Sequence, residues 1–125
     1  MSGVLAILVY DRDTQFREAL RNFLLTAGYS RVEVVATGRD ALALLRHERY
    51  RFVLVGLSQP LSRARRLADV VRVLQPDATV VFLVDAADAP AVEDTSLVYV
   101  IKEGAFPILL DVLADKENEP SRAKI

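Results

Sequence analysis

The sequence predicts an α/β protein with a parallel five-stranded sheet and helices on both faces. Three observations support this class. The chain of 125 residues is 52% hydrophobic and 26% charged, a composition typical of a globular domain with a sizeable core. Short unbroken apolar runs recur along it, as in strands that are buried on both faces. These runs alternate with helical segments in units of roughly 20–25 residues, the pattern of βαβ connections.

The first strand and helix are predicted from one apolar run and one cap. Residues 4–10 form a continuous apolar run and indicate a buried strand. Asp13 or Thr14 can cap the helix after it, because a short side-chain oxygen accepts hydrogen bonds from the free amides of the first turn. The helix has one apolar face and ends at Gly28, since glycine readily adopts the left-handed conformation of a helix stop.

The middle of the chain predicts two more strands and two helices. Residues 32–36 are partly polar, which favours a place near the edge of the sheet, and Thr37 can cap the helix that follows. Residues 52–57 are uniformly apolar or small and are the predicted centre of the sheet. Ser62 can cap a third helix, which ends before Pro76 because proline cannot continue a helix.

The last third predicts two strands and one regular helix. The strands are expected at residues 79–84 and 97–101. The segment 85–96 between them allows only a short or irregular fourth helix, because it lacks a clear apolar stripe and Pro90 interrupts it. A final amphipathic helix begins near Phe106.

Composition narrows the class of protein further. The absence of cysteine excludes a disulfide framework, a thiolate metal site and a cysteine nucleophile, and it fits a reducing cytoplasm. No basic region leads into a long apolar core, and no run approaches about 18 apolar residues, so we expect no signal peptide and no membrane span. We expect a cytoplasmic domain at residues 1–115 and a polar tail or linker at 116–125.

Charge is distributed unevenly, although the formal net charge is only −1. Residues 39–72 hold eight arginines against three carboxylates, and residues 77–119 hold ten carboxylates against two lysines. The ordinary interpretation is two solvated faces. The alternative is a molecule with opposite poles, suited to an oriented partner or a head-to-tail contact.

Any chemistry is expected where the carboxyl ends of the parallel strands converge on one edge of the sheet. That edge would hold Asp11 and its neighbours, Gly56, Asp85 and Lys102. The chain has neither a dinucleotide-binding nor a P-loop glycine motif. Ser58 lies in no nucleophile elbow, so the sequence does not predict an enzyme.

Several short stretches resemble one known family. They are Ile7-Leu8-Val9-Tyr10-Asp11-Arg12-Asp13, Gly28-Tyr29, Thr37-Gly38-Arg39-Asp40-Ala41-Leu42, the strand that ends four residues before Pro60, Pro76-Asp77 and Tyr99-Val100-Ile101-Lys102. In order and spacing they resemble the receiver domain of two-component response regulators over residues 4 to about 114. The resemblance implies a flavodoxin-like (CheY-like) sheet of strand order 2-1-3-4-5.

The same resemblance shows which site residues depart from the family. Gly56 stands where the family carries its phosphate-accepting aspartate. Asp11 matches the first acid of the Mg²⁺-binding pair, but Arg12 replaces the second, and Val84 replaces the hydroxyl residue at the end of strand four. Lys102 of strand five is retained.

These departures predict a degenerate site, a pseudo-receiver. Mg²⁺ requires oxygen ligands in near-octahedral geometry, and Gly56 supplies no carboxylate. Without a carboxylate there, no nucleophile forms an aspartyl phosphate. We expect Arg12 to pair with Asp11 and repel a divalent ion, and we expect a structural ion pair between Lys102 and Asp11 that Arg12 can join. No cofactor is predicted, and Mg²⁺ binding is expected to be lost. Tyr99 matches the family's switch aromatic, but its partner hydroxyl is missing.

Three functional hypotheses follow. The first is a non-enzymatic module that binds a protein partner or a second copy without phosphorylation, through the surface of helix four, strand five and helix five. The second is phosphorylation at a relocated acid, Asp85 or Asp13. The third is binding of an anion or nucleic acid through four arginines, Arg63, Arg65, Arg66 and Arg72. Two features argue against this hypothesis: no aromatic residues are interleaved with the arginines, and the pI is only about 5.8.

Overall fold

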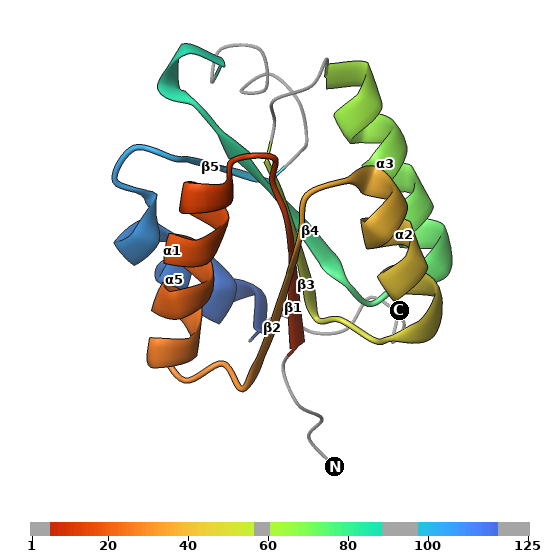
Figure 1. Cartoon of the computed structure of the whole chain (residues 1–125), viewed down its shortest axis with the longest axis horizontal. Helices are drawn as coiled ribbons and strands as arrows, with labels where there is room; N and C mark the ends of the chain where they lie inside the picture. The colour runs from red at the N-terminus through yellow and green to blue at the C-terminus, as the bar shows by residue number, and fades with distance from the viewer. Residues whose placement is uncertain (1–5, 57–60, 89–97, 118–125) are drawn as a thin grey trace.

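The computed structural model of the chain describes residues 6–56, 61–88 and 98–117, and its strands form one parallel sheet of order β2-β1-β3-β4-β5 (Figure 1). The predicted fold class and strand order are confirmed. The elements are β1 (Ala6–Tyr10), α1 (Thr14–Thr26), β2 (Arg31–Val35), α2 (Gly38–His47), β3 (Phe52–Gly56), α3 (Leu61–Leu74), β4 (Thr79–Val84), a 3-10 turn (Ala86–Asp88), β5 (Tyr99–Ile101) and α5 (Ala105–Glu117).

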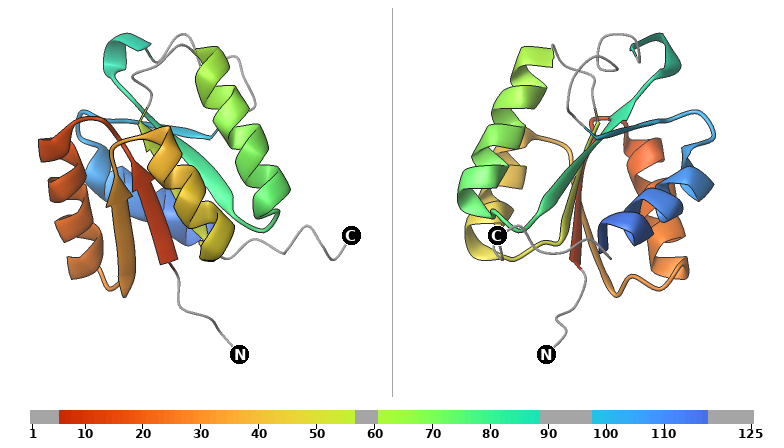
Figure 2. Two further views of the ribbon diagram at one scale, coloured as in Figure 1. Left: turned by 45° about the vertical axis from the view of Figure 1, so that its right-hand side comes forward. Right: turned by 180° about the vertical axis from the view of Figure 1, so that it is seen from behind.

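Helices cover both faces of the sheet. Figures 1 and 2 show α2 and α3 on one face and α1 and α5 on the other. All five residues of β3 are buried, and its side chains alternate between the two faces as the period of a strand requires. Phe52 and Leu54 pack in the core beneath α1 and α5, whereas Val53 and Val55 pack beneath α2 and α3. The strand predicted to be central is therefore central.

Two of the predicted helix caps are confirmed. Asp13 Oδ1 accepts a hydrogen bond from Phe16 N at 3.2 Å, and Thr37 Oγ1 accepts one from Asp40 N at 3.1 Å. Gly28 has a φ of +111°, the left-handed conformation expected after α1.

The predicted start of α3 is wrong by two residues, because a cap at Ser62 would place the first helical residue at position 63. The helix begins at Leu61, so Ser62 lies inside its first turn and is not its cap. An apolar stripe defines which face of a helix is buried, but it fixes the terminal residue only to within one or two positions.

The end of α5 also differs from the expectation. The helix continues to Glu117, two residues into the segment predicted as a tail. An Arg51 guanidinium nitrogen donates to the carbonyl of Lys116 and so satisfies one of the free carbonyls at the helix end. Between β4 and β5 the described residues hold only the 3-10 turn, in agreement with a short or irregular fourth helix, and residues 89–97 lie outside the described residues.

A polar network near the amino ends of β2 and β3 was not predicted. The Tyr50 side chain is buried, its hydroxyl donates to the Glu33 carboxylate, and the Arg31 guanidinium lies 5.2 Å from its ring centroid. Gln75 Oε1 accepts from the Tyr50 amide at 2.8 Å, and Gln75 Nε2 donates to the carbonyl of Leu45 at 2.9 Å. Burial, reinforced by the hydrogen bond to Glu33, raises the pKa of Tyr50 well above its ordinary value of 10.0.

None of the helices in the described ranges is long and apolar enough to cross a membrane.

Candidate functional site

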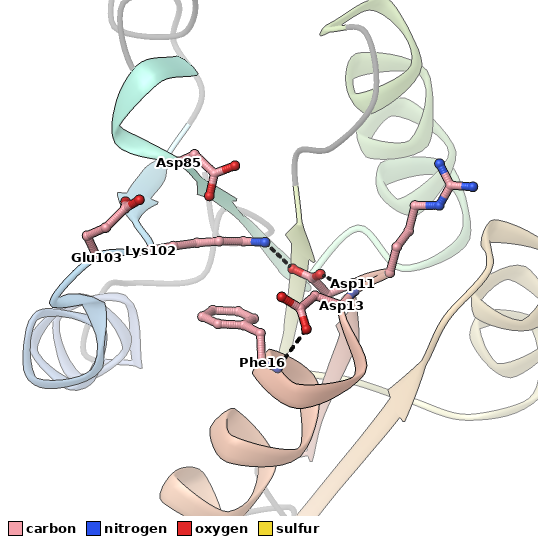
Figure 3. Close-up of a pocket in the computed structure, with 7 residues that line it drawn as sticks. Asp11, Asp13, Phe16, Asp85, Lys102 and Glu103 are labelled. Atoms are coloured by element: carbon pink, nitrogen blue, oxygen red, sulfur yellow. Dashed lines mark hydrogen bonds and ion pairs between the residues drawn. The ribbon is translucent and has the colours of Figure 1, made fainter.

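A pocket of about 530 Å³ lies where the carboxyl ends of β1, β4 and β5 meet (Figure 3). It is lined by Asp11, Arg12, Asp13, Phe16, Asp85, Lys102 and Glu103. The parallel register causes this convergence, because neighbouring strands end at nearly the same level: Tyr10 pairs with Val55, and Gly56 with Leu83. The edge of the sheet that the sequence singled out is therefore a real concavity.

Asp11 is the most deeply buried acid of this pocket, with 2% of its surface exposed. Its Oδ1 accepts a hydrogen bond from Asp13 N at 2.8 Å. Its Oδ2 lies 2.7 Å from Lys102 Nζ, and the two groups form an ion pair. The Arg17 guanidinium holds the Asp11 carbonyl at 2.8 Å. The carboxylate is thus fixed in place from several directions.

Lys102 is held between an acid and an aromatic ring. Its ammonium group lies 4.6 Å from the ring centroid of Phe16, within the range of a cation–π contact. Its amide donates to the Val84 carbonyl at 2.7 Å, which fixes the start of the loop after β5. Figure 3 shows the side chain extending from β5 across the pocket to Asp11. The Lys102 side chain is therefore part of the pocket wall, and 14% of its surface is exposed.

Gly56 lies directly beneath the Asp11 carboxylate. A Cβ atom on Gly56 would lie 2.1 Å from Asp11 Oδ2 and 2.5 Å from Asp11 Cγ, well inside van der Waals contact. The backbone of Gly56 is not in the left-handed region, so a side chain is excluded by Asp11 and not by backbone strain. In effect, Asp11 occupies the space where a side chain from the tip of β3 would begin.

The expected ion pair between Arg12 and Asp11 is wrong. Arg12 lines the pocket, but its side chain is exposed and makes no ion pair with Asp11 or any other residue in the described ranges. Arg12 lies in a bend just after β1, where its side chain is exposed while that of Asp11 is buried. Asp11 is instead paired with Lys102, as predicted.

Two further positions named from the sequence lie in the core. Val84 is fully buried and packs on the α2–α3 side of the sheet, where it lines no part of the pocket. Tyr99 is half-buried and packs against the same cluster, paired in register with Phe82 of β4. Neither side chain joins Asp11 and Lys102.

The two alternative acids do lie at the pocket. Asp13 and Asp85 are both exposed on its rim, and Asp13 is also the cap of α1 (Figure 3). Glu103 accepts a hydrogen bond from Ala86 N at 3.0 Å and so ties the loops after β4 and β5 together. Phe16, at the start of the apolar face of α1, was not predicted to line the pocket. Its place three residues after the helix cap was the signal that it would face this edge of the sheet.

The residues present do not fit a Mg²⁺ site. The buried acid is already paired with Lys102, Gly56 offers no side-chain ligand, and Arg12 adds a cation to the rim. Among the described residues, no group of three or more acids or histidines is arranged to hold a metal ion. Octahedral coordination by carboxylates is therefore not available here.

The basic residues named from the sequence lie on α3. Arg65 and Arg66 are exposed, and Arg72 pairs with Asp69 at 2.8 Å. The side chain of Arg63 is outside the part of the chain that the structure describes.

Comparisons with known proteins show likeness in fold. No protein-family model and no curated protein matches the sequence. Among solved structures, the chemotaxis response regulator CheY4 of Vibrio cholerae matches with a TM-score of 0.77 and 20% identity over 91% of this chain and 99% of that chain. A complex of the histidine kinase ThkA with the response regulator TrrA, the latter from Thermotoga maritima, matches with a TM-score of 0.70 and 23% identity over 90% and 97%.

A structure described as an adenylate cyclase from Rhodopirellula baltica also matches, with a TM-score of 0.72 and 17% identity over 89% of this chain and 85% of that chain. Identities this low establish the fold alone. The chain has the CheY-like fold of receiver domains. Its pocket lies at the carboxyl-end edge of the sheet, and the buried carboxylate of that pocket is paired with a lysine.

Proposed function

We propose that this chain is a receiver-like signalling module that acts by phosphorylation-independent protein–protein interaction and is not an enzyme. The observation that carries the proposal is the position of Asp11 over Gly56. The tip of β3 supplies no carboxylate, and the space for one is filled by an acid that is itself paired with Lys102. The five-stranded sheet of a receiver domain is present, while the groups needed for aspartyl phosphate chemistry are missing from the described strand ends.

The ion pair accounts for how the site is stable without a metal. A buried carboxylate is costly unless a cation or several hydrogen bonds compensate it. Here Lys102 supplies that compensation from within the chain. The pocket then needs no divalent ion to hold the loops after β1 and β5 together, and we propose that Mg²⁺ binding is lost.

Because the described site lacks the groups for phosphoryl transfer, we propose that the chain acts by binding a protein partner. The complex of a response regulator with a histidine kinase, seen among the similar structures, supports a protein partner of some kind. We propose β5 and α5 as part of the contact surface, where Ile101 and Ile108 are exposed apolar side chains. The helix-four part of that surface falls on residues 89–97, outside the described residues.

The test is exposure of the full chain to acetyl phosphate with Mg²⁺, followed by intact-mass measurement. The proposal predicts no added phosphoryl group under conditions in which a conventional receiver domain is modified. A mass gain in the wild type would contradict it.

A second candidate function is phosphorylation at a relocated acid, favoured only by the position of Asp13 and Asp85 on the pocket rim. The variants Asp85→Ala and Asp13→Ala separate it from the first. A mass gain that disappears in one variant would identify the acceptor. A gain that persists in both would place the modification elsewhere.

The third candidate, binding of an anion or nucleic acid, rests on Arg63, Arg65, Arg66 and Arg72. Exposure of Arg65 and Arg66 agrees with it, whereas the pairing of Arg72 with Asp69 removes one cation from that surface. Fluorescence anisotropy with a DNA duplex at low salt tests it, since nucleic-acid binding by such a surface is strongly salt-dependent.

A further inference from the structure

The face of the molecule formed by α2 and α3 exposes mainly positive charge. These helices lie side by side over one face of the sheet (Figure 1). Their exposed arginines, which we call the arginine face, are Arg39, Arg46, Arg65, Arg66 and Arg72. Only Arg72 has an acidic partner within the described residues. Against the remaining four, α2 and α3 expose one acid without a cation partner, Asp40.

The pocket has the opposite charge. Its lining holds four carboxylates against two cations. Asp11 and Lys102 neutralise one another in its wall, so the negative excess comes from three exposed rim acids, Asp13, Asp85 and Glu103.

The two surfaces are carried by different parts of the fold. Phe16 belongs to α1, and Lys102 and Glu103 lie between β5 and α5, so no described residue of α2 or α3 lines the pocket (Figure 3). Within the described residues no ion pair joins the arginine face to the rim acids, so their complementary charges can pair between molecules.

We propose that the arginine face of one copy docks on the acidic pocket of a second copy, in a head-to-tail contact. Arg65 or Arg66 places its guanidinium among the rim acids, because a planar guanidinium can bind two carboxylate oxygens at once. This contact adds a second copy of the chain as a partner, at surfaces other than the β5 and α5 surface named above, and it rests on the proposal that the chain acts through protein–protein interaction.

The geometry of the contact has a consequence for assembly. A head-to-tail contact uses two different surfaces, so every copy that docks leaves its own second surface free. Assembly therefore continues past the dimer unless the rotation closes a ring. Because the contact depends on exposed charges, it weakens as salt screens them.

The test is sedimentation velocity of the full chain at about 0.01 M and about 1 M salt, where the Debye length is about 30 Å and about 3 Å. We expect concentration-dependent species larger than the monomer at low salt and the monomer at high salt. Two double variants reverse the charges: R65E/R66E on the arginine face, and D85K/E103K on the pocket rim. Each alone is expected to weaken self-association about tenfold or more, because like charges then oppose one another.

An equimolar mixture of the two double variants supplies the decisive result. The new glutamates of one variant match the new lysines of the other, so the mixture should recover the larger species. R65K/R66K keeps the charge and should associate, and R49E changes an exposed arginine outside both surfaces and should behave as the wild type. Circular dichroism verifies that each variant is folded.

Three results would overturn the proposal: a wild type that is monomeric at both salt concentrations, a folded R65E/R66E that associates as the wild type does, or a mixture that does not recover association. A monomeric wild type that binds a DNA duplex through Arg65 and Arg66 would assign the arginine face to nucleic acid instead. None of these results changes the outcome of the acetyl phosphate assay, so the two proposals fail separately.

Discussion

Gly56→Ala is expected to destabilise the protein, although the usual effect of this substitution in a strand is the opposite. Gly56 lies in β3 without a left-handed backbone, and glycine in such a position costs roughly 0.5–1 kcal/mol relative to alanine. Its added Cβ, however, would lie 2.1 Å from Asp11 Oδ2 and 3.1 Å from Asp11 Cβ. The short Asp11 side chain can leave only by rotating away from Lys102 and from the Asp13 amide.

The expected magnitude follows from these opposing effects. Overpacking in a buried site costs about 1–3 kcal/mol, which exceeds the gain of up to about 1 kcal/mol from the restricted unfolded chain. We therefore expect a net loss of about 1–2 kcal/mol in the free energy of unfolding, measured by urea denaturation with unchanged slope.

A double-mutant cycle identifies the cause. If the clash with Asp11 is responsible, Asp11→Ala removes it, and the double variant should be more stable than the sum of the single effects by about 1–2 kcal/mol. Additive effects, or a Gly56→Ala protein as stable as the wild type, would refute the arrangement of Asp11 over Gly56.

Three further perturbations test other contacts. Lys102→Met should lower the free energy of unfolding by about 2–4 kcal/mol, because it leaves the buried Asp11 carboxylate without its cation; a loss below about 1 kcal/mol would mean that the pair is not structural. Thr37→Ala should cost about 1 kcal/mol through loss of the α2 cap, and Thr37→Ser should restore it; equal stabilities of the two variants would exclude the cap. The raised pKa of Tyr50 means that its contribution is fully present below pH 10.0 and is lost at higher pH, because the unfolded chain releases this proton first. Urea denaturation between pH 8 and pH 11 should show this fall in the wild type and less of it in Tyr50→Phe, and identical pH profiles would contradict the assignment.

Much of the fold could be predicted from the sequence because local signals agreed with the tertiary structure. The apolar run of β3 is buried on both faces, and the caps at Asp13 and Thr37 act as expected. The cap predicted at Ser62 is wrong because a hydroxyl residue near the start of a helix can also lie inside the first turn. The network around Tyr50 and Gln75 was missed, since no local spacing joins residues that lie on different elements.

The sequence predicted which residues form the site but not how their side chains are arranged. Strand ends converge in any parallel sheet, so Asp11, Gly56 and Lys102 could be brought together from the strand pattern. The sequence could not show that the Asp11 carboxylate would lie over Gly56, nor that Arg12 would face solvent. The position of Asp11 depends on the rotation of its side chain, which the ion pair with Lys102 fixes, and the outward direction of Arg12 depends on the bend after β1.

The central claim is that this site neither takes a phosphoryl group nor responds to its analogue. The most direct measurement is a titration of the ¹⁵N-labelled full chain with beryllofluoride and Mg²⁺, followed through the amide signals of Asp11, Gly56 and Lys102. We predict that these signals do not shift with either reagent, because Lys102 already pairs with the buried carboxylate of Asp11. Saturable shifts at these three amides would contradict the account and establish a working receiver site.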